Sequence, residues 1–285
     1  MSFRHSETLR VRWSEVDAQG IVFNGHYLNY LDTASTGYWR ALGLPYPGAF
    51  ETLGADLVLR STELDFLAPA RFDELLQCGL RFVEAGRTSL RFEAALSRGA
   101  QTLLKAQLRY VMVGREGPTA LQPTPVPEGL RAALQAFEAG EPMLSVQVGS
   151  WAELGAAAQP IRQAVFVREQ GIPADLEWDQ ADPGCTHAVA YNRLGQALGT
   201  GRLLEHVPGT AKIGRMAVLA AARGTGVGAQ VLDALMLAAR SQGYRQVLLH
   251  AQASAVGFYR RAGFSPRGAP FEEAGIEHQE MLKAL

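Results

Sequence analysis

The chain changes its hydrophobic pattern once, across a stretch rich in proline and glycine. This stretch covers residues 114–129, GREGPTALQPTPVPEG, and is followed by a short amphipathic helix, LRAALQAFEA, and by Gly140-Glu141-Pro142. Proline and glycine interrupt regular elements, and a strand-like pattern restarts at Leu144. The 285 residues are also nearly twice the number in an ordinary domain. The sequence therefore predicts two domains, residues 1–139 and 143–285.

The first half carries one helical segment between alternating segments. In residues 8–14, Leu9, Val11 and Trp13 alternate with polar residues, which predicts a half-buried strand. From Asn24 the apolar spacing becomes helical, and Gly43 ends it. After residue 55 alternation returns, with hairpin turns at Gly86 and Gly99 and with one apolar face on each of two strands: Leu90, Phe92, Ala94 and Leu96, and Leu104, Ala106, Leu108, Tyr110 and Met112. This pattern predicts an α+β domain in which a curved antiparallel sheet wraps around a long helix.

The second half alternates helices and strands throughout. We expect helices at 156–170, 226–241 and 254–262, and strands at 187–191, 197–205, 212–219, 246–250 and 277–283. A glycine-rich turn precedes the helix at 226–241. This order predicts an α/β or α+β fold that differs from the fold of the first half.

Composition excludes several classes of protein. Hydrophobic residues make up 47% of the chain and charged residues 19%, which excludes wholesale disorder. Because no apolar run is long enough to span a membrane and no apolar signal region follows Met1, we expect a cytoplasmic protein that does not bind membranes. A net charge of -1 argues against nucleic-acid binding but permits a local basic pocket for a phosphorylated ligand. Cys78 and Cys185 predict neither a disulfide framework nor a metal site.

The run of residues 13–28 places Asp17 in a short loop before the predicted helix. A helix N-terminus presents free N–H groups and a partial positive charge, which can polarise a carbonyl oxygen. A nearby carboxylate can then attack the carbonyl carbon or activate water, as thioester hydrolysis requires. The structural alternative is that Asp17 closes a turn and Asn24 caps the helix.

The whole run resembles the hotdog-fold acyl-CoA thioesterases of the 4-hydroxybenzoyl-CoA thioesterase type, over residues 7–137. The matching residues are Asp17, Gly20, Ile21, Val22, Asn24, Tyr27 and Leu28. The resemblance implies that Asp17 is the catalytic carboxylate and that a backbone N–H near Asn24 or Gly25 binds the thioester oxygen. Some relatives have a histidine at the place of Asn24, and the role of that histidine does not transfer to this chain. We interpret His26 as a helix-face residue. The resemblance also implies a homodimer or larger oligomer through residues 1–139, with active sites at the subunit interface.

The glycine-rich turn in the second half runs from Arg223 to Ala229, between a strand carrying Met216 and Val218 and the next helix. Backbone N–H groups in such a turn bind anions at a helix N-terminus. Three interpretations compete. A dinucleotide-binding fingerprint fits residues 224–229 but lacks the ribose-binding acid near Leu249-His250, and a P-loop lacks its Gly-Lys-Ser/Thr. A helix-capping glycine cluster is the structural alternative.

Arg223, Gly226 and Gly228 at this spacing, with the downstream run from Ala255 to Phe264, resemble the acetyl-CoA motifs of the GNAT superfamily of N-acetyltransferases. The resemblance covers residues 144–285 and implies acetyl-CoA or another acyl-CoA as substrate, with no metal. It implies that the amides of Met216 and Val218 hold the pantetheine or the acyl carbonyl. The pyrophosphate would lie on residues 223–229, which are Arg223, Gly224, Thr225, Gly226, Val227, Gly228 and Ala229.

Tyr259 is then expected to protonate the departing thiolate; its structural alternative is a buried core aromatic. The base that deprotonates the amine acceptor is left open among five candidates: Glu177, Glu205, His187, His250 and His278. We therefore predict a bifunctional enzyme, a hotdog acyl-CoA thioesterase followed by a GNAT acyltransferase. The alternatives are a thioesterase for acyl-carrier-protein thioesters and a non-catalytic CoA-binding regulator. Asp17 and Tyr259 argue against a regulator, because binding alone requires neither residue.

Overall fold

A computed structural model describes residues 3–117 and 120–285 of the chain. The chain forms two compact units, Met1–Met143 and Leu144–Leu285, which we describe separately. Residues 118–119 of the Pro- and Gly-rich stretch lie outside the described residues. Among the helices described, none is both long and apolar enough to cross a membrane.

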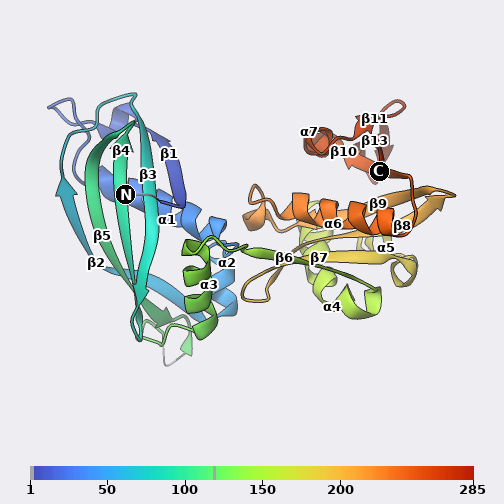
Figure 1. Cartoon of the computed structure of the whole chain (residues 1–285), viewed down its shortest axis with the longest axis horizontal. Coiled ribbons are helices and arrows are strands. Elements are labelled where there is room, and N and C mark those ends of the chain that lie inside the picture. Colours follow the sequence, from blue (N-terminus) through green and yellow to red (C-terminus); the bar gives the residue numbers. More distant parts are fainter. Residues whose placement is uncertain (1–2, 118–119) are drawn as a thin grey trace. The chain divides into compact units, whose positions relative to one another are not determined.

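The first unit is an antiparallel sheet with a long helix against one face (Figure 1). Within the described residues, its five strands follow the order β1-β3-β4-β5-β2. Its elements are β1 (His5–Arg10), α1 (His26–Ala41), α2 (Gly48–Thr52), β2 (Ala55–Phe66), β3 (Leu75–Ala85), β4 (Ser89–Arg98), β5 (Gln101–Gly114) and α3 (Glu128–Glu138). The predicted hotdog arrangement of antiparallel sheet and long helix is confirmed.

The core of the first unit lies between α1 and the sheet. The predicted apolar face of β4 is buried, and the ring of Phe92 packs edge-on against Tyr38 of α1 at 5.5 Å between centroids. The Tyr38 hydroxyl donates a 2.6 Å hydrogen bond to Glu138, which ties α3 to α1. Burial and this hydrogen bond raise the pKa of Tyr38, so the hydroxyl stays protonated.

The first strand was predicted over residues 8–14, and this prediction is wrong after Arg10, where β1 ends. Trp13–Glu15 form a 3₁₀ turn, and Trp13 is 76% exposed, with its ring edge-on to Phe72 at 5.4 Å. The chain turns here because the Glu15 carboxylate accepts a 2.7 Å bond from the N–H of Arg12. The predicted helix begins at His26 and not at Asn24.

The second unit is a mixed sheet with helices on both faces. Its strands follow the order β11-β13-β10-β9-β8-β7-β6, and β12 pairs with β13. The only parallel pair among them is β9–β10. The elements are β6 (Leu144–Gly149), α4 (Trp151–Arg162), a π-helix (Gln163–Glu169), α5 (Ala174–Glu177), β7 (Thr186–Asn192), β8 (Ala197–Val207), β9 (Thr210–Val218), α6 (Val227–Ser241), β10 (Gln246–Gln252), α7 (Val256–Arg261), β11 (Ser265–Pro266), β12 (Phe271–Glu273) and β13 (Ile276–Ala284). The predicted GNAT α/β fold is confirmed.

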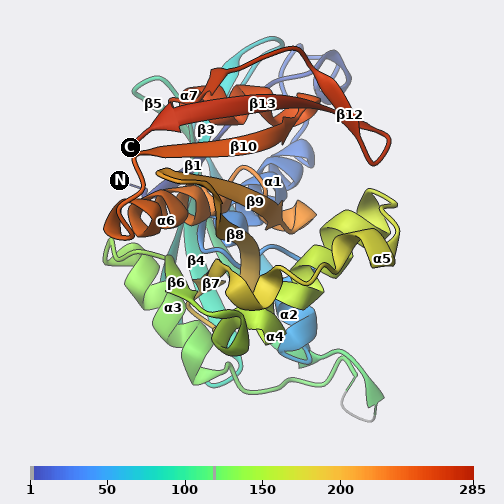
Figure 2. The same ribbon diagram turned by 90° about the vertical axis from the view of Figure 1, so that its right-hand side faces the viewer.

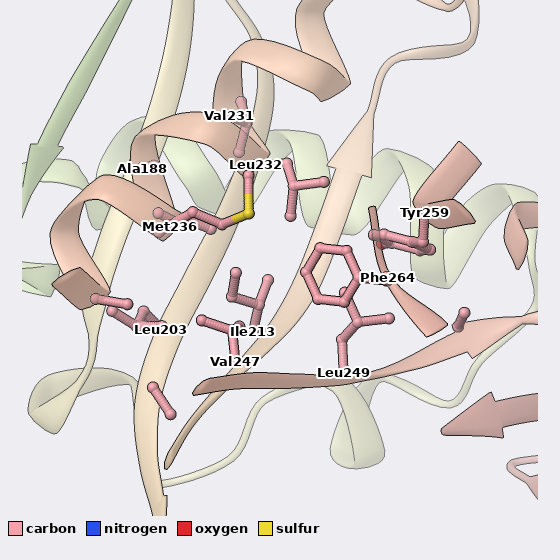
Figure 3. Close-up of a cluster of buried hydrophobic side chains, with 14 of the residues drawn as sticks. Ala188, Leu203, Ile213, Val231, Leu232, Met236, Val247, Leu249, Tyr259 and Phe264 are labelled. Carbon is pink, nitrogen blue, oxygen red and sulfur yellow. The ribbon is translucent and has the colours of Figure 1, made fainter. Parts of the chain in front are cut away.

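Successive side chains along each strand point to opposite faces of the sheet, and each face packs against a different helix. Ala188 and Ala190 of β7 join the core under α6, whereas Val189 between them packs with α4. Figure 3 shows the α6 core, in which Ile213 of β9 and Leu249 of β10 lie beneath the helix, and Tyr259 and Phe264 lie beside them. The helix expected at 156–170 starts earlier, because Ser150 and Glu153 form a capping box before Trp151.

A network of buried charges joins α4 to the loop before β7. Arg162 is 1% exposed; its guanidinium donates to the Glu177 carboxylate and makes two 2.9 Å bonds to Asp182. Arg202 of β8 also binds Asp182, at 2.7 Å, and pairs with Asp179 at 2.6 Å. The hydrogen bond from Arg202 lowers the pKa of Asp179 to about 2, which keeps this carboxylate ionised. Each buried charge in the network therefore has an opposite partner.

Candidate active sites

Asp17 lies in a closed loop between β1 and α1. Its N–H donates to Ile21 O at 2.9 Å, and its Oδ1 accepts a 2.8 Å bond from the N–H of Gln19. Gly20 adopts a φ of +72°, which a glycine accommodates without strain. The predicted alternative role of Asp17 in closing a turn is thus confirmed, while its Oδ2 makes none of the hydrogen bonds found among the described residues. The turn fixes the carboxylate and leaves one oxygen available.

The start of α1 lies at the other end of this loop. Val16 and Val22 form a bridge across the loop, and the N–H of Phe23 donates to Glu15 O at 2.9 Å. The first N–H groups of the helix bond to carbonyls of residues 23–25, and the Asn24 side chain makes no capping hydrogen bond. Within the described chain, the N–H groups of Asn24 and Gly25 donate no backbone hydrogen bond. The suggested capping role of Asn24 is therefore wrong, and two N–H groups are open beside the Asp17 loop.

Glu15, the other carboxylate near this loop, is held by structural bonds. Its Oε2 accepts from the N–H of Arg12 at 2.7 Å and from the Tyr30 hydroxyl at 2.7 Å. Burial and the bond to Glu15 raise the pKa of Tyr30, so this hydroxyl remains a donor. Glu15 is thus held by the backbone before the loop and by the helix α1, whereas the Asp17 carboxylate is bound only within its own turn.

In the second unit, β9 and β10 pair only from Thr210 to Ile213 and then separate (Figure 2). A β-bulge against β8 occurs at the same place, and Arg215 has a φ of +50°. A positive φ is costly for a residue with a side chain and is often kept at functional sites. Beyond Ile213, the edge of β9 that faces β10, which includes Met216 and Val218, is not paired with β10.

The glycine-rich turn follows β9 and leads into α6. Gly224 and Gly226 have φ values of +82° and +89°, and no atom lies within 4 Å of a Cβ placed on either. The Gln230 N–H donates to Gly226 O, so the N–H groups of residues 227–229 point out of the helix end. The turn therefore presents a run of backbone donors to open space, as phosphate binding requires.

The side chains of the turn point elsewhere. Arg223 makes two 2.7 Å bonds to Glu169 at the end of the π-helix, and its Nε donates to Val218 O at 3.1 Å. The Thr225 hydroxyl donates to Ala222 O at 2.7 Å. A phosphate at this turn would therefore be bound by backbone groups and not by the Arg223 guanidinium.

Tyr259 of α7 is 7% exposed and lines a cavity of about 410 Å³ at the fork of β9 and β10. Burial raises the pKa of Tyr259 to about 12, so the hydroxyl is protonated at neutral pH. No hydrogen bond to this hydroxyl occurs within residues 3–117 and 120–285. Tyr259 packs in the α6 core, as the structural alternative predicts, and it also lines the cavity. Its role as the proton donor to the thiolate stays a prediction.

The five candidate bases differ in whether they line the cavity and in whether other residues already bind them. His187 is buried against Asp182 O, and burial lowers its pKa; Glu205 is exposed on β8; neither lines the cavity. Glu177 lines the cavity but is bound by Arg162 and Arg215. His250 and His278 both line the cavity, and neither histidine takes part in the ion pairs of Glu177 with Arg162 and Arg215.

The predictions from sequence did not include Lys212 and Glu273, which line the cavity, or Arg162, which lies at the centre of the buried network. Arg162 had a detectable signal, because it lies among apolar residues of one helix. Lys212 and Glu273 had none, because only the strand pairing brings them together. Among the described residues, no group of three or more His, Cys, Asp or Glu side chains could hold a metal ion.

Comparison with known proteins matches each unit to a family. The family model described as "Acetyltransferase (GNAT) domain" matches residues 162–285, and the one described as "Thioesterase superfamily" matches residues 19–105. An uncharacterized N-acetyltransferase of Bacillus subtilis is 36% identical over 124 residues, which are 43% of this chain and 87% of that protein.

The first unit has relatives of a different kind. An acyl-CoA thioesterase of Haemophilus influenzae is 28% identical over 114 residues, which are 39% of this chain and 84% of that protein. A thioesterase of Thermus thermophilus, solved with coenzyme A and zinc, is 28% identical, with a TM-score of 0.42 over 50% of this chain and 98% of that one. The second unit thus belongs to the GNAT acetyltransferase family and the first unit matches the thioesterase superfamily model, so the chain is an enzyme that joins thioester hydrolysis to N-acyl transfer.

Proposed function

We propose that the first unit hydrolyses acyl-CoA thioesters with Asp17 as its catalytic carboxylate. The observation that carries this proposal is the fixed Asp17 carboxylate, with its unused Oδ2, at one end of a loop whose other end exposes the Asn24 and Gly25 N–H groups. These N–H groups would bind the thioester oxygen and stabilise the charge that develops on it. Asp17 would attack the carbonyl carbon or activate a water molecule that does so.

We propose that the second unit transfers an acetyl or other acyl group from CoA to an amine. The fork of β9 and β10 would take the pantetheine along Met216 and Val218, and the turn at residues 223–229 would take the pyrophosphate. Tyr259, whose hydroxyl is protonated, would give its proton to the departing sulfur. The two buried free cysteines, Cys78 and Cys185, support a reducing compartment such as the cytoplasm.

An acyl-CoA panel tests the hydrolase against its alternatives. Thiol release from acyl-CoA without added amine supports the proposal. Release only from acyl-carrier-protein thioesters would favour that substrate class. Tight CoA binding with no release, even with a broad panel of amines, would favour a regulator.

We further propose that the two units are separable near residues 140–143, and that a fragment 143–285 folds and binds acetyl-CoA. In this fragment Gly226→Asp is expected to abolish measurable binding. The substitution forces a side chain onto a φ of +89° and places a negative charge where the pyrophosphate would lie. Calorimetric titration with acetyl-CoA measures the effect.

Gly195→Asp is the matched control. Gly195 also has a positive φ, +73°, with no atom within 4 Å of an added Cβ, but it lies in the turn between β7 and β8. It should therefore keep acetyl-CoA binding. In the full chain, Gly226→Asp should leave hydrolysis by the first unit unchanged. A folded wild-type fragment that does not bind acetyl-CoA would contradict the assignment of the turn.

We propose that the first unit forms at least a dimer through the edge strand β2. Val58 and Leu59 are consecutive, so their side chains point to opposite faces, and they are 45% and 42% exposed. An edge strand of 12 residues with apolar side chains open on both faces favours pairing with another copy.

Sedimentation at micromolar concentration should therefore give at least twice the chain mass of 30.8 kDa. Leu59→Glu should shift the protein toward the monomer, because it places a charge in the interface. Leu121→Glu is the control, since Leu121 is 75% exposed in a loop after β5. A monomeric wild-type protein would overturn the proposal.

A further inference from the structure

The cavity at the fork has a charged end that the proposed function does not use. It is lined by Lys212 of β9, His250 of β10 and Glu273 of β12. The Lys212 Nζ lies 3.3 Å from His250 Nδ1, and the Glu273 Oε2 lies 3.1 Å from the same nitrogen. Because Tyr259 lines the same cavity of about 410 Å³, the charged end and the reacting end share one small space.

Strand pairing brings these groups to one face of the sheet. Ile213 and Leu249 pack into the α6 core, so their neighbours Lys212 and His250 point to the opposite face. His250 pairs with Glu280 of β13, and the β12–β13 hairpin carries Glu273 beside it. Ionisable side chains from four strands therefore meet at this face.

His250 has a partner for each protonation state of its Nδ1. The Lys212 ammonium can donate to Nδ1 when that atom carries no proton, and the Glu273 carboxylate can accept from it when it does. A ring placed in this way can gain and lose a proton without losing its hydrogen bond. His278 differs, because its Nδ1 is bound to Ile276 O at 2.8 Å.

Lys212 is a half-buried cation without a direct ion pair among the described residues, and the carboxylates that act on it from further away are Glu273 and Glu280. No Asp or Glu oxygen among the described residues lies within 4.0 Å of its ammonium, and burial lowers its pKa. Arg215, also at this cavity, is already paired with Glu177 at 2.9 Å and with Asp179 at 3.2 Å. An anionic group of a ligand at the charged end would therefore find its partner in Lys212.

We propose that the charged end is the acceptor site for a small primary amine that carries a carboxylate, an amino acid. Lys212 binds the carboxylate, and His250, positioned by Glu273, takes a proton from the ammonium group. The two groups of an α-amino acid are joined by one carbon, which suits the adjacent Lys212 and His250. The inference rests on the proposed acyl transfer by the second unit.

The proposed transfer converts one ammonium group and one thioester into an amide and a thiol, and it releases one proton. One proton of the acceptor ammonium passes to His250 and leaves later to water. The freed nitrogen lone pair forms the C–N bond to the thioester carbonyl carbon while the C–S bond breaks. Tyr259 gives its proton to the sulfur and recovers the second proton lost by the nitrogen. The products are the N-acyl amino acid and free CoA thiol.

The test uses the full chain with acetyl-CoA and matched amines that differ by one carboxylate: L-leucine with 3-methylbutylamine, and L-phenylalanine with 2-phenylethylamine. The readout is the N-acetylated product, which thioester hydrolysis does not form. The amino acids should react about tenfold to a hundredfold faster in kcat/KM, the range of one hydrogen bond between charged groups. Lys212→Met should remove this preference, whereas Lys105→Met, in the first unit, should keep it.

His250→Gln should lower turnover of every amine about a hundredfold at neutral pH, as expected for loss of a general base. The loss should shrink as the pH approaches the pKa of the amine, where free amine forms without a base. A purely structural role would not give this rescue. Glu273→Gln should lower turnover less, and Glu272→Gln, exposed on the same strand, should not. The other charged groups at this face remain in these variants: Glu280, 3.7 Å from His250 Nε2, His278, Glu177 and Arg215.

Titration of the full chain and of its Gly226→Asp variant with coenzyme A distinguishes failure of the acyl transfer from failure of the acceptor site. The first unit is also proposed to bind CoA thioesters, so the binding that Gly226→Asp removes is the binding to the second unit. If this substitution removes no binding, the proposed acyl transfer fails and the acceptor site fails with it. If it removes binding but the wild-type chain acetylates no amino acid, or shows neither the carboxylate preference nor the pH-dependent loss, only the acceptor site is overturned.

Discussion

Replacing Asp17 by asparagine is expected to lower thioester hydrolysis by about a hundredfold to ten-thousandfold, the usual contribution of a general acid–base group. Asparagine keeps the size of the side chain and an oxygen that can accept the 2.8 Å bond from Gln19. The loop should therefore keep its shape while the ionisable oxygen is lost. Thiol release from an acyl-CoA, without added amine, measures the effect.

Asp73→Asn is the matched control. Asp73 is another turn aspartate of the first unit, paired with Arg10 at the surface, and its φ of +65° is one that asparagine also adopts. Its replacement should leave hydrolysis unchanged. Near-wild-type turnover by a folded Asp17→Asn protein would remove Asp17 from the mechanism.

Replacing Arg162 by methionine is expected to destabilise the second unit by about 3–5 kcal/mol, the cost of removing one partner of a buried ion pair. The Glu177 and Asp182 carboxylates would each lose charged hydrogen bonds where Arg162 is only 1% exposed. Urea unfolding, followed by a probe in the second unit, should show the midpoint moving down.

Arg240→Met serves as the control, because Arg240 is exposed in the last turn of α6. A second variant tests the reason for the loss. Combining Arg162→Met with Glu177→Gln and Asp182→Asn removes the unpaired charges, and it should recover part of the stability. An Arg162→Met protein as stable as the wild type would show that the network contributes little.

The sequence predicted the elements whose signals are local. The alternation of Leu90, Phe92, Ala94 and Leu96 predicted a strand with one buried face, and that face is buried. The same kind of pattern misled at Trp13, because alternation does not show where a chain turns, and the Glu15 carboxylate turns it there. The Asp17 loop and the glycine turn were predicted because their residues are contiguous.

The charged end of the cavity could not be predicted in the same way. His250 and Glu273 are 23 residues apart and meet only because the β12–β13 hairpin folds back beside β10. The π-helix Gln163–Glu169 is continuous in sequence with α4, and nothing in its apolar spacing marks the wider turn. Such features depend on the pairing of distant segments, which one sequence does not record.

One face of β9 and β10 packs in the core beneath α6, and the other face lines the cavity. This separation has a consequence for how related enzymes can diverge. Ile213 and Leu249 support α6, and substitutions there would open the core. Lys212 and His250, one position away on each strand, face the cavity and leave that core untouched. Substitutions at a few cavity positions would therefore alter the proposed acceptor site without opening the core beneath α6.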